Sequence, residues 1–180
     1  MANRGTIDGE LHRPILNRDE FPNLIKIPVP ILYGELVVFT KDVDFEITGW
    51  DSLKPYTFGI QASTQETSVR EKGIQAELVT DADQLFKKLA AGRNDIIVIP
   101  RGLGMDVLKS MLALPPEGID PEALQGIRIL EPPLQRDALY HYLHTKHAEL
   151  VPKITAVLQE MEEEGLLQRI KEEFEAEVFE

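Results

Sequence analysis

The sequence lacks cysteine entirely, has few aromatic residues and contains fewer basic than acidic side chains. Without cysteine there are no disulfides, thiolate zinc sites or cysteine nucleophiles, although the compartment stays undecided. Lys and Arg number 19 against 31 Asp and Glu, which gives a formal net charge of −12. A phosphate backbone or an anionic membrane surface needs clustered positive charge. We therefore expect neither nucleic acid nor membrane lipid as a partner.

Long hydrophobic runs are also missing. No segment approaches the roughly 18 apolar residues of a membrane-spanning helix. The stretch Met1–Glu20 has no apolar core of the signal-peptide type, so no signal peptide is expected in this chain. Apolar residues still make up 43% of the 180 residues and charged residues 28%, which is typical of a globular protein with one ordinary domain or two small lobes.

The stretch Asp81–Pro100, DADQLFKKLAAGRNDIIVIP, predicts a helix, a tight turn and a buried strand. Thr80 is expected to cap the helix with Asp83 as its partner, and Gly92 to supply the left-handed turn that ends it. Asp95 then opens IIVI, a continuous apolar run typical of a strand covered on both faces. The apolar stripe of the helix is expected at Leu85, Phe86 and Leu89.

The chain opens on what looks like the end of the same unit. Gly5 and Asp8 precede GEL much as Gly92 and Asp95 precede the later strand. Since a strand of this kind normally packs beside a helix, we expect this first copy to have lost its upstream elements; the alternative is a chance echo over few residues.

Elsewhere strands and helices alternate, which indicates an α/β fold with a mainly parallel sheet. Strands are expected at 36–40, 56–61, 74–79 and 127–134, the last cut off by Pro132 and Pro133. Helices are expected from Ser63 or Thr64 to Gly73, over 101–112, over 150–161 and from 166 onward, with a loop over 115–126. The proline-containing stretches 28–40 and 129–142 are expected to pair with each other as two hinge strands.

Four motifs occur in a telling order: WDSLK, GIQASTQE, LFKKLAAGRNDIIV and LYHYLHTKHAELVPKITAVLQEMEEEG. This set resembles the family 3 extracellular solute-binding proteins, the periplasmic receptors of amino-acid ABC transporters, over nearly the whole chain. The resemblance implies a type II periplasmic-binding-protein fold, truncated at the N-terminus. Lobe 2 would be complete over 45–134, and an incomplete lobe 1 would be formed by 1–44 and 135–180.

The resemblance also implies a function. A small solute would bind between the lobes, a membrane permease would be the partner, and the location would be periplasmic or extracytoplasmic, without enzymatic activity or cofactor. In the family, a strand-to-helix loop of lobe 2 offers N–H groups and a hydroxyl to the ligand carboxylate, a place held here by Ser63 and Thr64. An arginine of lobe 1 completes the grip, with Arg13 and Arg18 as candidates. The alternatives are that Ser63 and Thr64 only cap a helix and that the two arginines are ordinary surface residues.

One departure from the family concerns the ammonium group of an amino acid. Where members that bind amino acids carry an acidic residue at the end of the lobe 2 strand, this chain has Pro100 followed by Arg101. Arg101 would repel an ammonium group. We therefore expect an anionic solute, with Arg101 among the binding residues.

Three classes of function stay open at this stage. The first is the solute-binding protein; the second is an interaction or scaffold protein of this fold without a small ligand. The third is an enzyme on this fold, for which Glu10 is the obvious acidic candidate. The histidines of HYLHTKH are not spaced for a zinc site, and no nucleophile elbow or phosphate loop occurs. An open sheet edge in lobe 1 also predicts a homodimer through that lobe.

Overall fold

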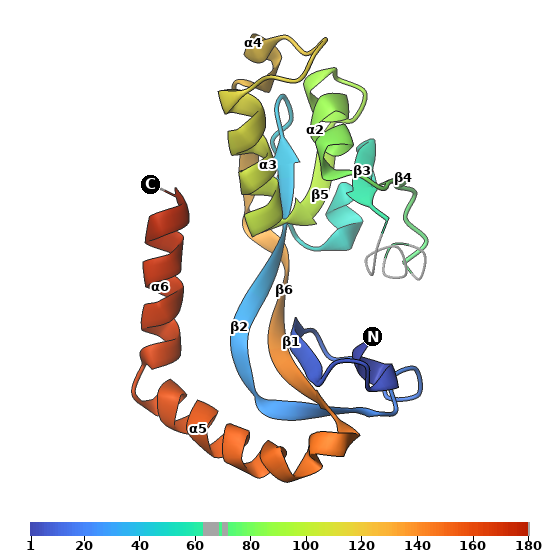
Figure 1. Cartoon of the computed structure of the whole chain (residues 1–180). Helices are drawn as coiled ribbons and strands as arrows, with labels where there is room; N and C mark the ends of the chain where they lie inside the picture. Colours follow the sequence, from blue (N-terminus) through green and yellow to red (C-terminus); the bar gives the residue numbers. More distant parts are fainter. Residues whose placement is uncertain (63–68, 70–71, 180) are drawn as a thin grey trace. The chain divides into compact units, whose positions relative to one another are not determined.

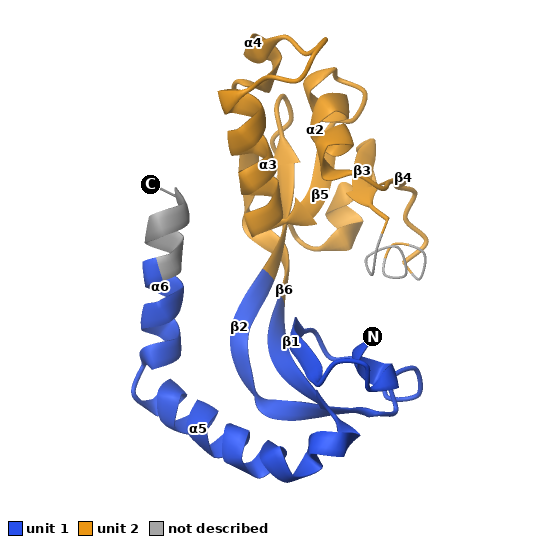
Figure 2. Cartoon of the chain, viewed as in Figure 1, with its two compact units in different colours: residues 1–34, 137–180 blue, residues 35–136 orange. Residues whose placement is uncertain are grey.

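A computed structural model describes the chain except for residues 63–68, 70–71 and 180, with side chains as far as residue 173. The chain forms two compact units (Figure 2). Unit 1 comprises 1–34 and 137–180, and unit 2 comprises 35–136. The segment 45–134, expected to form lobe 2, lies within unit 2.

The strands have the order β1-β6-β2-β5-β3-β4 (Figure 1). The pairs β1–β6 and β2–β5 are antiparallel, whereas β3 is parallel to both β4 and β5, so the sheet is mixed. β2 and β6 are hydrogen-bonded neighbours, which confirms the predicted pairing of 28–40 with 129–142. The bounds are β1 Gly9–Arg13, β2 Leu24–Thr40, β3 Phe58–Gln61, β4 Glu77–Val79, β5 Ile96–Pro100 and β6 Arg128–His144.

Successive side chains of the strands in unit 2 point to opposite faces of the sheet and form two separate hydrophobic cores. On one face, Val38, Ile60 and Val98 pack with Trp50 and other side chains, among them those of the short 3₁₀ helix η2 (Trp50–Leu53). On the other face, residues such as Val37, Phe39, Ile97 and Ile99 pack against the helices. This two-sided burial explains the continuous apolar run of β5, as predicted for a strand covered on both faces.

Helices α2 (Ala82–Ala90) and α3 (Arg101–Ala113) cover the second face (Figure 1). The predicted stripe of α2 is buried as expected, with Leu85, Phe86 and Leu89 in the core. Gly92 has φ of 64°, which confirms the left-handed turn. The cap prediction was wrong by one residue: Asp81, not Thr80, caps α2, and its carboxylate accepts from the N–H of Asp83 at 3.0 Å.

Unit 1 is built around parts of β2 and β6. On one side, Ile27 and Val29 of β2 pack with residues of α5 (Val151–Glu163) such as Leu158. On the other side, Leu24 and Tyr142 pack with the N-terminal segment that begins in η1 (Ala2–Arg4). The 3₁₀ segment η3 (Thr145–Leu150) precedes α5, and α6 (Leu166–Phe179) follows it. The break between α5 and α6 lies at Gly165, φ 68°, as the sequence predicted.

Two further predictions of local structure were wrong. The strand expected to stop at Pro132 and Pro133 continues as β6 to His144. Both prolines lie outside the part of β6 that pairs with β1, which begins at Tyr140, so their missing N–H groups cost no hydrogen bond on that side. The expected loop over 115–126 contains one helical turn, α4 (Pro121–Leu124), capped by Asp120 with Pro121 in the first position.

Candidate functional site

The aspartate of each Gly-x-x-Asp segment binds side chains or backbone groups of a neighbouring segment. In unit 2 the Asp95 carboxylate accepts from Thr57 twice, from the N–H at 2.8 Å and from Oγ1 at 2.7 Å. Asp95 N–H donates to Thr57 O at 2.9 Å in return. These bonds join the starts of β3 and β5. The aspartate of this motif is therefore engaged in structure.

The copy in unit 1 is similar in backbone but different in partners. Gly5 has φ of 73° and Asp8 directly precedes β1. One Asp8 carboxylate oxygen lies 2.8 Å from Lys146 Nζ and 2.8 Å from His147 Nε2. Hydrogen bonds from Lys146 and then His147 lower the pKa of Asp8 to about 2. Asp8 thus ties the N-terminal segment to η3.

Arg101, one of the predicted ligand residues, lies in the first turn of α3 and is held by two glutamates. Its Nε lies 2.6 Å from Glu35 of β2, and Nη2 lies 2.8 Å from Glu131 of β6. Arg136 Nε approaches the other oxygen of Glu35 at 3.8 Å. Partial burial acts to lower the pKa of Arg101, but the hydrogen bonds to Glu131 and Glu35 outweigh it, so the pKa lies above its ordinary value. The positive charge expected here is balanced within unit 2.

The two arginines predicted for lobe 1 have different surroundings. Arg13 ends β1, and its Nε donates to Glu10 at 2.9 Å, so this guanidinium already holds a carboxylate. The same contact occupies Glu10, the candidate acid of the enzyme hypothesis. Arg18 lies in the loop between β1 and β2 and forms no ion pair or hydrogen bond with the described part of the chain. Of these two arginines, Arg18 is therefore the one whose guanidinium is open to a ligand within the described part of the chain.

Arg18 borders a pocket of about 440 Å³ within unit 1. The described residues that line it include two cations, Arg18 and Lys26, and no carboxylate. Asn17 and Thr145 add neutral polar groups. The remaining walls are largely apolar, with Ile15, Leu16, Phe21, Pro22, Leu24 and Ile25. The pocket thus combines positive charge with an apolar surface.

Tyr142 fixes the loop that carries Arg18. Its ring is buried beneath the pocket, and its hydroxyl accepts from Leu16 N–H at 3.0 Å and donates to Pro14 O at 3.1 Å. Lys26 is oriented by a second tyrosine, since its Nζ lies 4.3 Å from the centroid of the Tyr140 ring. Sequence reasoning missed Lys26 and Tyr142. The sequence signal that could have found them is the alternation of side chains along a strand, because residues two apart, such as Tyr140 and Tyr142 of β6, lie on the same face.

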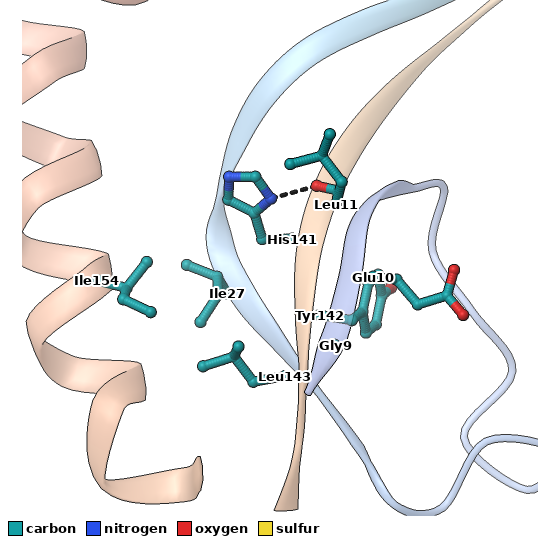
Figure 3. Close-up of a pocket in the computed structure, with 8 residues that line it drawn as sticks. All are labelled: Gly9, Glu10, Leu11, Ile27, His141, Tyr142, Leu143 and Ile154. Atoms are coloured by element: carbon teal, nitrogen blue, oxygen red, sulfur yellow. Dashed lines mark hydrogen bonds between the residues drawn. The ribbon is translucent and has the colours of Figure 1, made fainter. Parts of the chain in front are cut away.

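A second pocket in unit 1, about 410 Å³, lies between the sheet and α5 (Figure 3). Leu11, Ile27, Leu143 and Ile154 line it with apolar surface. His141 also faces it and hydrogen-bonds through Nδ1 to Leu11 O. This pocket has no charge suited to a small polar solute, because the Glu10 carboxylate points away from it (Figure 3).

The remaining polar candidates contribute less. His144 accepts from Lys146 N–H at 3.1 Å, and His147 pairs with Asp8, so the three histidines act separately. Across the described residues, no group of three or more His, Asp or Glu side chains is arranged to hold a metal ion. None of the described helices has the length and apolar character needed to traverse a bilayer. Ser63 and Thr64 lie outside the described residues, as does most of the helix expected from there to Gly73.

The chain matches no known protein-family model. A protein of Shewanella oneidensis, described only as uncharacterized, is 28% identical over 98% of this chain. The chain spans 65% of the length of that relative.

Solved structures show a clearer likeness. A histidine kinase sensor domain with similarity to periplasmic binding proteins has a TM-score of 0.69 at 15% identity and covers 96% of this chain, which spans 71% of it. An ancestral arginine-binding protein bound to glutamine has a TM-score of 0.63 at 21% identity and covers 96% of this chain, which spans 72% of it. The ligand-binding core of GluR0 from Nostoc punctiforme, in complex with L-glutamate, has a TM-score of 0.62 at 18% identity and covers 96% of this chain, which spans 74% of it.

These likenesses establish the fold. The chain has a mixed α/β fold of the type II periplasmic-binding-protein kind, as the sequence motifs predicted. The structures that share it include proteins that bind amino acids. At identities of 15–21%, the choice of ligand has to be argued from the residues of this chain.

Proposed function

We propose that the chain is the solute-recognising part of an extracytoplasmic binding protein of the ABC-transporter type, and that its solute is a small anion. The observation that carries the proposal is the pocket in unit 1, where Arg18 and Lys26 face apolar walls without a carboxylate among the described lining residues. The fold supports the same class of function, since proteins that bind small solutes share it.

The charges of the chain make local groups decisive. A solute anion approaches a protein with a formal net charge of −12, so long-range attraction does not assist binding. Binding has to come from short contacts, and a guanidinium without a partner is suited to a bidentate grip on a carboxylate. Lys26 adds a second positive charge, and the described lining residues include no carboxylate that would pair with an ammonium group. The apolar walls favour a carboxylate carried on an apolar body.

The family resemblance names four further binding groups, Ser63, Thr64, Arg13 and Arg101, and neither Arg13 nor Arg101 lines the Arg18 pocket. Ser63 and Thr64 are proposed as N–H and hydroxyl donors to the ligand on the family resemblance. Arg13 and Arg101 would each have to exchange a glutamate for the solute, because Glu10 and Glu35 now hold them. Arg18 should therefore contribute most of the affinity. A permease would be the partner that receives the solute.

A thermal-shift panel tests the proposal. Butanoate, succinate and phenylacetate are compared with glycine, histidine and glutamine at equal concentration. A carboxylate at about 100 times its Kd should add about 2.7 kcal/mol to the free energy of unfolding, whereas the zwitterions should add less. The Arg18→Gln variant should lose most of this gain.

A matched control is Arg169→Gln, which removes the same charge from an exposed position on α6, away from the pocket lining. It should keep the response of the unaltered protein. If no solute shifts the melting temperature, the chain fits the second candidate class, an interaction protein without a small ligand. Stronger shifts from the zwitterions would contradict the anion proposal.

A further inference from the structure

We infer that the solute of the Arg18 pocket is a dicarboxylate with an apolar spacer, one carboxylate bound by Arg18 and the other by Lys26. This inference rests on the proposed solute-binding function and names the chemical class of the solute. The pocket, about 440 Å³ in unit 1, has these two cations and no carboxylate among its described lining residues. A monocarboxylate would pair with one of the two charges, whereas a dicarboxylate would pair with both and so match the charge of the site.

Lys26 presents its charge on the face of the sheet that carries the pocket. Side chains two residues apart on a strand point to the same face. Lys26 therefore follows Leu24, which packs with Tyr142 at the pocket, and not Ile27, which packs toward α5. Its Nζ lies 4.3 Å from the centroid of the Tyr140 ring. A tyrosine ring attracts an ammonium group through its quadrupole but carries no net charge, so the contact positions the charge of Lys26 without neutralising it.

The acidic side chains of the surrounding segments leave these two cations uncompensated. The Glu10 carboxylate accepts from Arg13 Nε at 2.9 Å. The Glu20 carboxylate accepts from Asn17 Nδ2 at 3.4 Å. Neither of these glutamates lines the pocket, and nor does Asp19. Within the part of the chain that the structure describes, neither cation forms an ion pair, so both charges are available to a ligand.

The walls of the pocket select the body of the solute. Ile15, Leu16, Phe21 and Leu24 present apolar surface, which favours a spacer of methylene groups or aromatic carbon atoms. An acidic amino acid also carries two carboxylates, but its ammonium group would lie beside two cations, with no carboxylate among the described lining residues to pair with it. The site should therefore favour glutarate over glutamate, although the two share one carbon skeleton.

Calorimetric titration of the full chain with a series of diacids tests the inference. Succinate, glutarate, adipate and pimelate are each compared with their monomethyl ester, which keeps the length of the ligand and removes one charge; glutarate is also compared with glutamate. The net charge of −12 repels a dianion more than a monoanion, so the titrations are made at about 0.15 M salt, where the Debye length is about 8 Å. At the best-fitting length, the dicarboxylate should bind about 10-fold more tightly than its ester, the low end of what a charged hydrogen-bonded contact contributes.

Variants of the two cations assign the second carboxylate to Lys26. Lys26→Gln should remove the preference for the dicarboxylate and leave the affinity for the ester nearly unchanged, and ester binding also shows that this variant is folded. Lys26→Arg keeps the charge and should retain the preference. Arg18→Gln should weaken both ligands, because Arg18 holds the carboxylate that they share. Lys153→Gln is the matched control, since it removes the same charge from an exposed position on α5, outside the pocket lining, and the preference should persist.

The outcomes separate this inference from the proposed function. If ester and dicarboxylate bind with equal affinity at every length, the inference is wrong and the solute-anion proposal stands. A preference for the dicarboxylate that survives in Lys26→Gln, or tighter binding of glutamate than of glutarate, would overturn the inference as well. Binding of neither ester nor dicarboxylate would contradict the proposed function itself, and the inference would fall with it.

Discussion

Replacing Gly104 by alanine should destabilise the protein through one crowded contact in the core of unit 2. A Cβ atom at this position of α3 would lie 2.5 Å from Phe39 Cε2 and 2.8 Å from Ile99 Cγ2. Carbon atoms in favourable contact are about 3.5–4.0 Å apart, so the overlap is about 1 Å. Both neighbours are fully buried, and the Phe39 ring meets the Phe86 ring edge to face at 5.1 Å between centroids.

The size of the effect follows from this geometry. Phe39 cannot retreat without disturbing Phe86, so α3 has to move instead. Overpacking of this kind costs about 1–3 kcal/mol. Alanine favours a helix interior over glycine by up to about 1 kcal/mol, which partly offsets the cost. The shift would also displace Arg101, in the first turn of the same helix, from Glu35 and Glu131.

Gly102→Ala is the matched control, because Gly102 lies in the same helix and a Cβ atom there would have no neighbour within 4 Å. It has the propensity gain without the overlap. Urea unfolding of the two variants should therefore differ by the overlap term, about 1–3 kcal/mol in favour of Gly102→Ala. If the two variants were equally stable, the described packing of α3 against β2 and β5 would be wrong.

Two aspartates give further predictions. The pKa of Asp8 is depressed to about 2, so this carboxylate contributes stability above its unfolded pKa and loses that contribution as pH falls through 2. The stabilities of the unaltered protein and of Asp8→Asn, measured by acid unfolding, should therefore converge between about pH 4 and pH 2. A constant difference in stability across that window would refute the assignment. Asp95→Ala should cost about 1–3 kcal/mol in urea unfolding, because it removes two hydrogen bonds from Thr57, its N–H and its hydroxyl, each with a net contribution of about 0.5–1.5 kcal/mol. Asp81→Ala, which removes only the α2 cap, should cost about 1 kcal/mol. An Asp95→Ala loss no larger than that of Asp81→Ala would contradict the structural role of Asp95.

The sequence predicted the regular elements best where one period continued over several residues. The stripe of α2, the run of β5 and the break at Gly165 each depend on local periodicity or on one glycine conformation. β6 was cut short at Pro132 because a proline was treated by its own propensity, whereas its position outside the part paired with β1 decides its tolerance. The loop expected over 115–126 took no account of Asp120 and Pro121, which begin the single turn of α4.

The site was less accessible to sequence reasoning. Arg13 and Arg18 were equivalent in the sequence, and only the contact between Arg13 and Glu10 separates them. Arg101 was interpreted as an uncompensated charge because its partners, Glu35 and Glu131, are 66 and 30 residues away. Such pairings depend on which strands become neighbours. Lys26 was missed for the same reason, since its place beside Tyr140 depends on the pairing of β2 with β6.

Calorimetric titration with phenylacetate, phenylalanine and phenethylamine tests the central claim most directly, because these ligands share an aromatic body and differ mainly in charge. The account predicts that phenylacetate binds most tightly and that Arg18→Gln weakens it about 10- to 150-fold, the loss expected for a charged hydrogen-bonded contact of about 1.5–3 kcal/mol. Arg169→Gln should leave the affinity unchanged. Tighter binding of phenylalanine or phenethylamine, or an equal loss in both variants, would contradict the claim that Arg18 holds a solute anion.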